Sequence, residues 1–200
     1  MYELVLYYMT NDKNNLIDAA TNFVNNNKAS KFLDPNYAFE IIDERHTKYI
    51  LKWRNKPNIM TWMILQDEFT ETLQNEFLKN YRVLDRIDFI LVNKQTREPY
   101  GSFHLTRLPS NRSDGLCGYE IGKLVGDEKQ RKKGIAYNAT RALLSFVFEE
   151  LKLDVVYART KFDNKVNYRL NKKLGFTSIG KEDVGNGRIF IIMELKNNLR

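Results

Sequence analysis

Residues 124–136 read Leu124-Val125-Gly126-Asp127-Glu128-Lys129-Gln130-Arg131-Lys132-Lys133-Gly134-Ile135-Ala136. This stretch joins a predicted strand to the start of a long predicted helix, and three cations precede the first helical turn. A helix N-terminus offers unpaired backbone N–H groups and the positive end of the helix dipole. Gly134 lets the backbone come close to a ligand because it has no Cβ. The combination predicts a site for a pyrophosphate.

A simpler interpretation of the same stretch is a solvent-exposed basic cap on an ordinary helix. A single Arg-x-x-Gly-x-Ala pattern is weak support for a binding site, because short patterns recur by chance. The stretch lacks the spacing of a P-loop, and it lacks the first two glycines of the dinucleotide-binding fingerprint.

Hydrophobic periodicity outward from this stretch predicts alternating strands and helices. The predicted strands span residues 37–42, 87–93, 100–108, 116–125, 154–161 and 188–195. The predicted helices span residues 44–54, 70–81, 134–151 and 164–174. The order is a β-meander followed by β-α-β-α-β, which predicts an α/β (α+β) fold with a mixed sheet covered by helices.

The N-terminal residues 1–36 are interpreted as an appendage packed on or beside a domain of residues 37–200. They contain a strand-like run at Tyr2–Tyr8 and a helix-like segment at Asn15–Val24. No apolar run reaches the length of a membrane span. The start of the chain also lacks the basic leader and the cleavage site of a signal peptide.

The composition includes a single cysteine, Cys117, and a formal net charge of +7. One cysteine excludes an intrachain disulfide and fits a reducing compartment, so a cytoplasmic location is expected. Cys117 is expected to be a small buried residue, not a nucleophile. The net charge has two interpretations, nucleic-acid binding or solvated lysines with a site for an anionic ligand. Because acidic residues interrupt the basic runs, the second is favoured, and neither nucleic acid nor membrane is expected as a partner.

A second motif lies in residues 164–176, where a predicted helix ends in Lys173-Leu174-Gly175-Phe176. Together with Arg131-Lys132-Lys133-Gly134-Ile135-Ala136, it resembles the paired signatures of the GNAT superfamily of N-acetyltransferases. The resemblance covers roughly residues 37–195. It implies a mostly antiparallel mixed sheet flanked by helices, acetyl-CoA as the cosubstrate and no metal.

The resemblance also implies a set of cofactor-binding residues. The backbone amides of Arg131, Lys132, Lys133, Gly134, Ile135 and Ala136 would hold the coenzyme A pyrophosphate. The strand ending at Leu124 and Val125 would pair with the pantetheine arm as if the arm were another strand. Asn164, at the start of the second motif, would contact the cofactor.

The segment Trp53-Arg54-Asn55 is similar to the acceptor side of GNAT enzymes that acetylate nucleotide-linked aminosugars, with the pseudaminic-acid pathway enzyme as the nearest match. In that subgroup Arg54 and Met63 would approach the nucleotide, with Tyr119 beside it. The same opening occurs in relatives that acetylate protein N-termini or polyamines, so these acceptors stay open. Without the resemblance, Trp53 would be a packing residue and Arg54 a surface ion-pair partner.

Acetyl transfer to an amine needs a base for the amine, a donor for the oxyanion and a proton for the departing thiolate. Glu120 is the predicted base, and His104, placed on the substrate side, is its rival. His46 is expected at the surface. Many relatives have a tyrosine acid at the position of Asn171, which cannot donate a proton in this way. Tyr168 is the predicted substitute for this tyrosine acid. The protein is expected to be a monomer or a homodimer.

Overall fold

The computed structural model describes residues 16–109, 112 and 114–197. The strand-like run Tyr2–Tyr8 therefore lies outside the described residues. The described part contains one seven-stranded sheet with the order β1-β2-β3-β4-β5-β7-β6. Its strands are β1 (Tyr37–Ile41), β2 (Arg86–Asn93), β3 (Pro99–Arg107), β4 (Tyr119–Val125), β5 (Val155–Lys161), β6 (Thr177–Asp183) and β7 (Ile189–Lys196). Every neighbouring pair is antiparallel except β4 and β5, which confirms the mixed, mostly antiparallel sheet.

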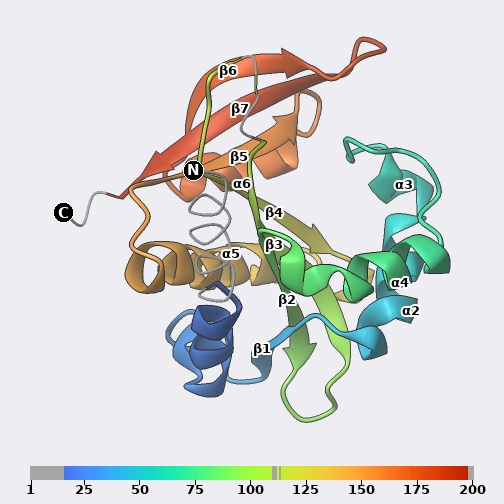
Figure 1. The fold of residues 1–200 in the computed structure, drawn as a ribbon, viewed down its shortest axis with the longest axis vertical. Helices are drawn as coiled ribbons and strands as arrows, with labels where there is room; N and C mark the ends of the chain where they lie inside the picture. Colours follow the sequence, from blue (N-terminus) through green and yellow to red (C-terminus); the bar gives the residue numbers. More distant parts are fainter. Residues whose placement is uncertain (1–15, 110–111, 113, 198–200) are drawn as a thin grey trace, which may run out of the picture.

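The helices lie on both faces of this sheet (Figure 1). They are α2 (Thr47–Arg54), α3 (Pro57–Met60), α4 (Glu71–Lys79), α5 (Ile135–Ser145) and α6 (Lys165–Lys173). The first three gather on one side, and α5 lies on the other with the helical residues 16–25. The α5 helix continues into a π-helical turn, Phe146–Glu150. Thr70 caps α4, because its hydroxyl accepts a hydrogen bond from the N–H of Leu73 at 3.3 Å.

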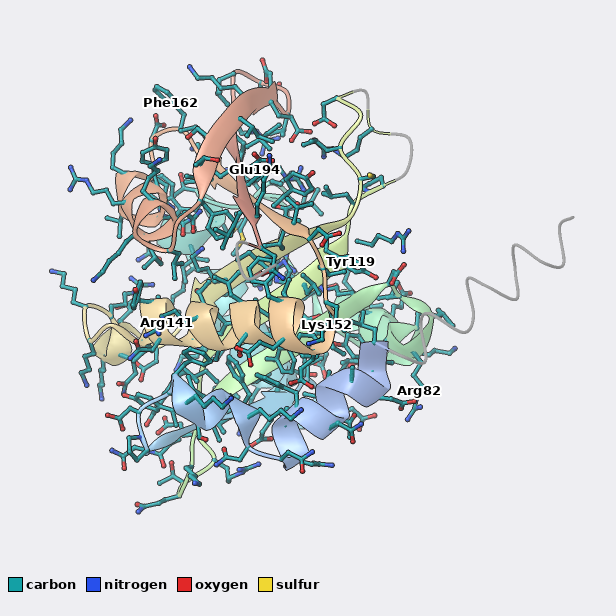
Figure 2. The ribbon with its side chains drawn as sticks, turned by 90° about the vertical axis from the view of Figure 1, so that its left-hand side faces the viewer. Arg82, Tyr119, Arg141, Lys152, Phe162 and Glu194 are labelled. Atoms are coloured by element: carbon teal, nitrogen blue, oxygen red, sulfur yellow. The ribbon has the colours of Figure 1, made fainter. Side chains whose placement is uncertain are left out.

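Residues 16–36 share the core of the sheet and are not a separate body. The Phe23 ring lies 5.9 Å from Phe89 of β2 and 5.3 Å from Phe146, measured between ring centroids. Figure 2 shows residues 16–25 (blue) running beside α5 (tan) on this face. The Lys28 ammonium also lies 2.6 Å from the Glu150 carboxylate. The segment therefore covers the apolar face of β2 and contacts the π-helical turn that follows α5.

Alternation along the strands places two sets of side chains on opposite faces. One face carries the aromatic core with Phe89 and Phe103, and α5 packs on it. On the other face, Asp88, His104 and Gly122 form one row across β2, β3 and β4. Polar groups in a row on central strands are unusual, and this row points to a functional surface beneath α2 and α4.

Four expectations from the sequence differ from the structure. The strand β6 and the short helix α3 were not predicted, and Pro57 begins α3 in addition to following α2. Cys117 is exposed, so the expectation of a buried thiol is wrong. His46 is buried, so the expectation that it lies at the surface is wrong. Its imidazole accepts a hydrogen bond from the Asp43 backbone N–H at 3.0 Å and lies 3.4 Å from the Glu40 carboxylate.

Across the described ranges, the structure contains no helix with the length and apolarity that crossing a membrane requires.

Candidate active site

The central feature of the site is the separation of β4 from β5. These parallel strands pair at a single register position, Glu120 with Tyr157. Beyond it, β4 stays paired with β3 as far as Val125, while β5 stays paired with β7. Among the residues that the structure describes, the edge of β4 that faces β5, including Leu124 and Val125, is therefore left without a strand partner. An unpaired strand edge presents N–H and C=O groups to any extended ligand.

The N-terminus of α5 lies just beyond this open edge. Gly134 is its N-cap, with a φ of 77°, and no side chain among the described residues caps the helix. A Cβ added to Gly134 would meet no described atom within 4 Å. The N–H groups of the first turn are therefore open to a ligand, whereas the N-termini of α4 and α6 are capped by Thr70 and Asn164.

The loop between β4 and α5 is held in place from below. The Gly126 and Asp127 N–H groups both donate to the Tyr100 carbonyl, at 3.0 and 3.1 Å. The Trp53 ring of α2 packs directly on Gly126, where an added Cβ would lie 1.9 Å from the ring. Trp53 is thus a buried packing residue that holds α2 against the loop, which is the role expected for it without the family resemblance.

The predicted basic residues of the loop are exposed around the helix end. Arg131, Lys132 and Lys133 are all exposed, and Ile135 is buried beneath the first turn. Arg131 lies 3.9 Å from Glu128, and Lys133 donates to Gln130 at 3.3 Å. Lys132 has a φ of 64°, which turns the chain before Gly134. Half-buried Ala136 keeps the surface of the first turn low.

These features fit the coenzyme that the sequence predicts. An uncapped helix N-terminus with open space at Gly134 accepts phosphate oxygens, and the cations around it complement the charge. The free edge of β4 can pair with an extended amide-containing arm. Asn164 lies at the start of α6. Its side chain caps that helix by accepting a hydrogen bond from the Asn167 N–H at 3.0 Å.

The predicted acceptor residue Arg54 lies over the polar row of the sheet. Its guanidinium stacks on the Phe69 ring, 3.9 Å from the ring centroid. Burial lowers the pKa of Arg54, and the neighbouring Arg86 lowers it further, although it stays charged at neutral pH. Arg54 forms no ion pair with any carboxylate of the described residues, so this half-buried cation is available to an anionic ligand.

The neighbouring charges are fully paired. Arg86 and Asp88 form a two-point ion pair with both distances at 2.7 Å. Burial alone would raise the pKa of Asp88, but Arg86 outweighs it and holds that pKa below its usual range. Burial and Arg86 together lower the pKa of His104 to about 3. His104 is therefore a neutral imidazole near pH 7, able to hydrogen-bond but poorly matched to the role of a base. Its ring covers Gly122, where a Cβ would lie 2.1 Å from it.

Glu120 lies at the point where β4 and β5 part. Its carboxylate accepts two hydrogen bonds from Arg159 Nε, at 3.1 and 2.9 Å. Arg159 also donates to Glu182 of β6 at 3.1 Å. To accept a proton from an amine or a water, Glu120 must exchange part of this pairing.

The other predicted residues are more scattered. The Tyr119 hydroxyl donates to the Asp85 carboxylate at 3.0 Å, and Figure 2 shows this tyrosine at the start of β4. Met63 is partly buried against the core after α3. The Tyr168 hydroxyl lies 3.3 Å from the Ser178 hydroxyl, in a hollow between α6 and β6 that Phe162 and Lys181 also line. The structure thus places the residues of β4 and of the α5 N-terminus that were predicted to bind the coenzyme close together, and it places Tyr168 elsewhere.

Three polar residues in this region were not predicted from the sequence. Lys123, Thr160 and Asn171 form one hydrogen-bonded group where β4 and β5 separate. Nothing local in the sequence marks them as a group, because they come from three elements. The Arg86 and Asp88 pair was also missed, although two charges alternating with apolar residues in Arg86-Ile87-Asp88-Phe89 are a visible signal.

The comparisons with known proteins agree with this geometry. The family model described as "Acetyltransferase (GNAT) domain" matches residues 39–177. The chain therefore belongs to the GNAT acetyltransferase family, and the predicted enzyme class is confirmed at the level of the family.

Individual relatives are more distant. An N-acetyltransferase 9-like protein of Caenorhabditis elegans is 32% identical over 71 residues, which are 35% of each protein. The match thus spans about a third of that relative. Spermidine N-acetyltransferase from Vibrio cholerae, solved with CoA and spermine, has a TM-score of 0.69 at 18% identity and covers 82% of this chain and 96% of its own. Ribosomal-protein-S5-alanine acetyltransferase from Vibrio fischeri has a TM-score of 0.68 at 17% identity, covering 84% and 96%. These two structures establish the fold.

Proposed function

We propose that this protein transfers the acetyl group of acetyl-CoA directly to a primary amine. The observation that carries the proposal is the uncapped N-terminus of α5 at Gly134, placed beside the unpaired edge of β4. The first feature suits the pyrophosphate and the second suits the pantetheine arm. The acetyl group would then lie where β4 and β5 begin to separate, next to Glu120.

We propose that the acceptor amine is joined to an anionic group, and a nucleotide-linked aminosugar is the preferred class. Arg54 supports this choice, because it is a half-buried cation without an ion-pair partner among the described residues, and it lies over the acceptor face. A guanidinium can bind a phosphate through two parallel hydrogen bonds. Met63 and Tyr119 would supply contacts at the edge of this surface.

A second candidate acceptor is the N-terminus of a protein, with polyamines as a further alternative. The similar solved structures favour this group, since they include a ribosomal-protein-S5-alanine acetyltransferase and a spermidine N-acetyltransferase. A polyamine would have to approach Arg54 and Arg86, and two cations disfavour a polycationic substrate. For this reason we rank the protein N-terminus above the polyamine.

In the proposed reaction Glu120 accepts the proton of the amine, directly or through a water, after loosening its pairing with Arg159. The backbone N–H groups on the free edge of β4 would donate to the developing oxyanion. Tyr168 as the acid remains a prediction of the sequence that nothing in the site geometry supports. A cytoplasmic, monomeric or homodimeric enzyme with no metal completes the proposal.

A panel assay tests the acceptor class. The purified protein is mixed with acetyl-CoA and one amine at a time, and the release of free thiol is followed. We expect turnover with nucleotide-linked aminosugars, and none with the same sugars lacking the nucleotide. Turnover of peptides alone would transfer the assignment to protein N-termini. If no amine of any class released thiol, the proposed activity would be wrong.

A further inference from the structure

A lysine crosses the gap between β4 and α6 at the place where the sheet opens. The Lys123 ammonium donates a hydrogen bond to the Asn171 side-chain oxygen at 2.6 Å. Lys123 lies on β4, three residues after the Glu120–Tyr157 pair, and Asn171 lies on α6. The Lys123 side chain is half-buried, and no described carboxylate pairs with it. A long cationic side chain held inside the molecule by a neutral amide calls for a reason other than packing.

The partner of this lysine is held rigidly. Asn171 is fully buried, and its amide nitrogen donates to the Thr160 hydroxyl at 3.0 Å. The same hydroxyl accepts from the Asn167 amide at 2.9 Å. Because the amide nitrogen faces Thr160, the amide oxygen must face Lys123. Asn171 therefore fixes the position of the ammonium without neutralising its charge.

The position relative to the proposed reaction follows from the strand alternation. Glu120 lies on the acceptor face of β4, and Lys123 lies on the opposite face with α5 and α6. An amine approaching from the acceptor face therefore meets the acetyl group between these two residues. Glu120 can take a proton on one side, and Lys123 can give one on the other.

The electrostatic surroundings of Lys123 suit a proton donor. Burial lowers its pKa to about 8. On the neighbouring strand β3, the titratable group that interacts electrostatically with Lys123 is His104, which is neutral near pH 7. No charged group of the described parts of β4, β5, α5 or α6 accounts for the shift, which comes from burial. A cysteine thiol has an ordinary pKa of about 8.5, which is above the pKa of Lys123, so the transfer of a proton from the ammonium to a thiolate is favourable.

We propose that Lys123 is a catalytic residue that protonates the departing thiolate of coenzyme A, and that Asn171 is its positioning residue. The inference rests on the proposed acetyl transfer. The amine nitrogen forms a bond to the carbonyl carbon, and the carbon–sulfur bond breaks with its electron pair going to sulfur. The sulfur takes a proton from the Lys123 ammonium, while Glu120 receives the proton lost by the amine. Lys123 regains a proton from water once the products have left.

Asn171 and Tyr168, the two other side chains considered as proton donors to the thiolate, are less suitable than Lys123. The Asn171 amide has no acidic proton at neutral pH. The Tyr168 hydroxyl is directed to Ser178 of β6, and not to the β4 edge. Of these three side chains, Lys123 is thus the one that can donate a proton at the free edge of β4.

The test compares Lys123→Met, Lys123→Arg and a control at an exposed lysine of α4, Lys79→Met. We expect kcat to fall about 100-fold or more in Lys123→Met, with the calorimetric Kd for CoA changed less than about threefold. Lys123→Arg should be equally slow, because a guanidinium keeps the charge but does not release its proton. Lys79→Met should match the unmodified protein, and melting curves confirm that each variant is folded.

The pH dependence gives a second, independent readout. The ammonium is the active form, so kcat of the unmodified protein should decline as pH rises through about 8. Asn171→Asp should move this decline to higher pH, because a carboxylate raises the pKa of a lysine beside it. This shift does not depend on whether Lys123→Met folds.

Three results would overturn the proposal: a kcat of Lys123→Met within about twofold of the unmodified protein, recovery of kcat in Lys123→Arg, or a larger loss in Tyr168→Phe than in Lys123→Met. Failure of the underlying function is distinguishable from these. In that case the unmodified protein itself would neither bind CoA nor release thiol.

Discussion

At the residue scale, Gly134 combines a backbone requirement with a binding requirement. Its φ of 77° is in the left-handed region, and the space in front of it is open to the described residues. We predict that Gly134→Ala lowers the free energy of unfolding by about 1 kcal/mol, through backbone strain alone. Calorimetry should show a CoA affinity lower by about tenfold or more, because the added Cβ takes up the space of the ligand.

A matched control exists for this change. Gly187 has a φ of 68° and equally open surroundings, but it lies in the β6–β7 connection. Gly187→Ala should therefore cost similar stability and leave CoA affinity unchanged. Equal losses of affinity in both variants would remove the pyrophosphate role from Gly134.

Arg54 gives the corresponding prediction on the acceptor side. Arg54→Ala should raise KM for a nucleotide-linked acceptor about 10- to 100-fold, since a hydrogen bond to a charged group contributes about 1.5–3 kcal/mol. The KM for acetyl-CoA should change far less. The control is Arg82→Ala at an exposed position near β2. Equal effects of Arg54→Ala on both substrates would contradict a role in nucleotide binding.

The uncapped helix start at Gly134 could be predicted because its sequence signal is local. The predicted coenzyme motif occupies six consecutive residues, Arg131–Ala136. Lys123 and Asn171 are 48 positions apart, and only the parting of β4 and β5 makes them partners. The exposure of Cys117 and the burial of His46 were misjudged, because hydrophobic periodicity does not report the exposure of these two residues.

At the element scale, α2 and the loop before α5 depend on one close contact. Gly126→Ala would place a methyl group inside the Trp53 ring, so one element must shift. We predict a loss of about 1–3 kcal/mol in the free energy of unfolding, measured by urea denaturation. CoA affinity should fall as well, because the displaced loop carries the first turn of α5.

The control for this change is Gly180→Ala in β6, where the added Cβ would make an ordinary contact at 3.9 Å with Ile192. It should cost little stability. Adding Trp53→Leu to Gly126→Ala should recover part of the loss. If the double variant were no better than the sum of the single changes, the clash would not be the cause.

The elements differ in how visible they are in the sequence. The buried strands β2, β3, β5 and β7 were predicted within one or two residues, since their apolar patterns are strong. The edge strand β6 was missed, because nearly all its residues are exposed and show no alternation. Its pairing with β7 comes from the tertiary structure, which a period-two pattern cannot report.

At the scale of the whole molecule, both histidines make stability depend on pH. Burial lowers the pKa of His46 and of His104, to about 3 in the case of His104. An unfolded histidine titrates near 6.5, so between about pH 6.5 and 3 an unfolded His104 binds a proton that the folded His104 does not. Stability must therefore fall as pH falls through this window. Between pH 7.5 and 5.0 we predict that His104 contributes a loss of about 2 kcal/mol in the free energy of unfolding, measured from urea midpoints. His46 contributes a loss in the same direction.

The variant His104→Gln isolates one of these contributions, because glutamine keeps a polar group without titrating. Its stability should vary less with pH over the same range. Asp88 acts at lower pH only, since its pKa is held below the usual range and its contribution is lost as pH falls through that value. An unchanged pH dependence in His104→Gln would show that the imidazole is not buried in its neutral form.

The central claim is that the N-terminus of α5 and the free edge of β4 together bind coenzyme A. The most direct measurement is a calorimetric titration of the intact chain with CoA. We predict saturable binding of one CoA per chain, with a Kd on the order of 10–100 μM. The absence of any binding heat up to millimolar CoA, with the protein shown to be folded, would contradict the account.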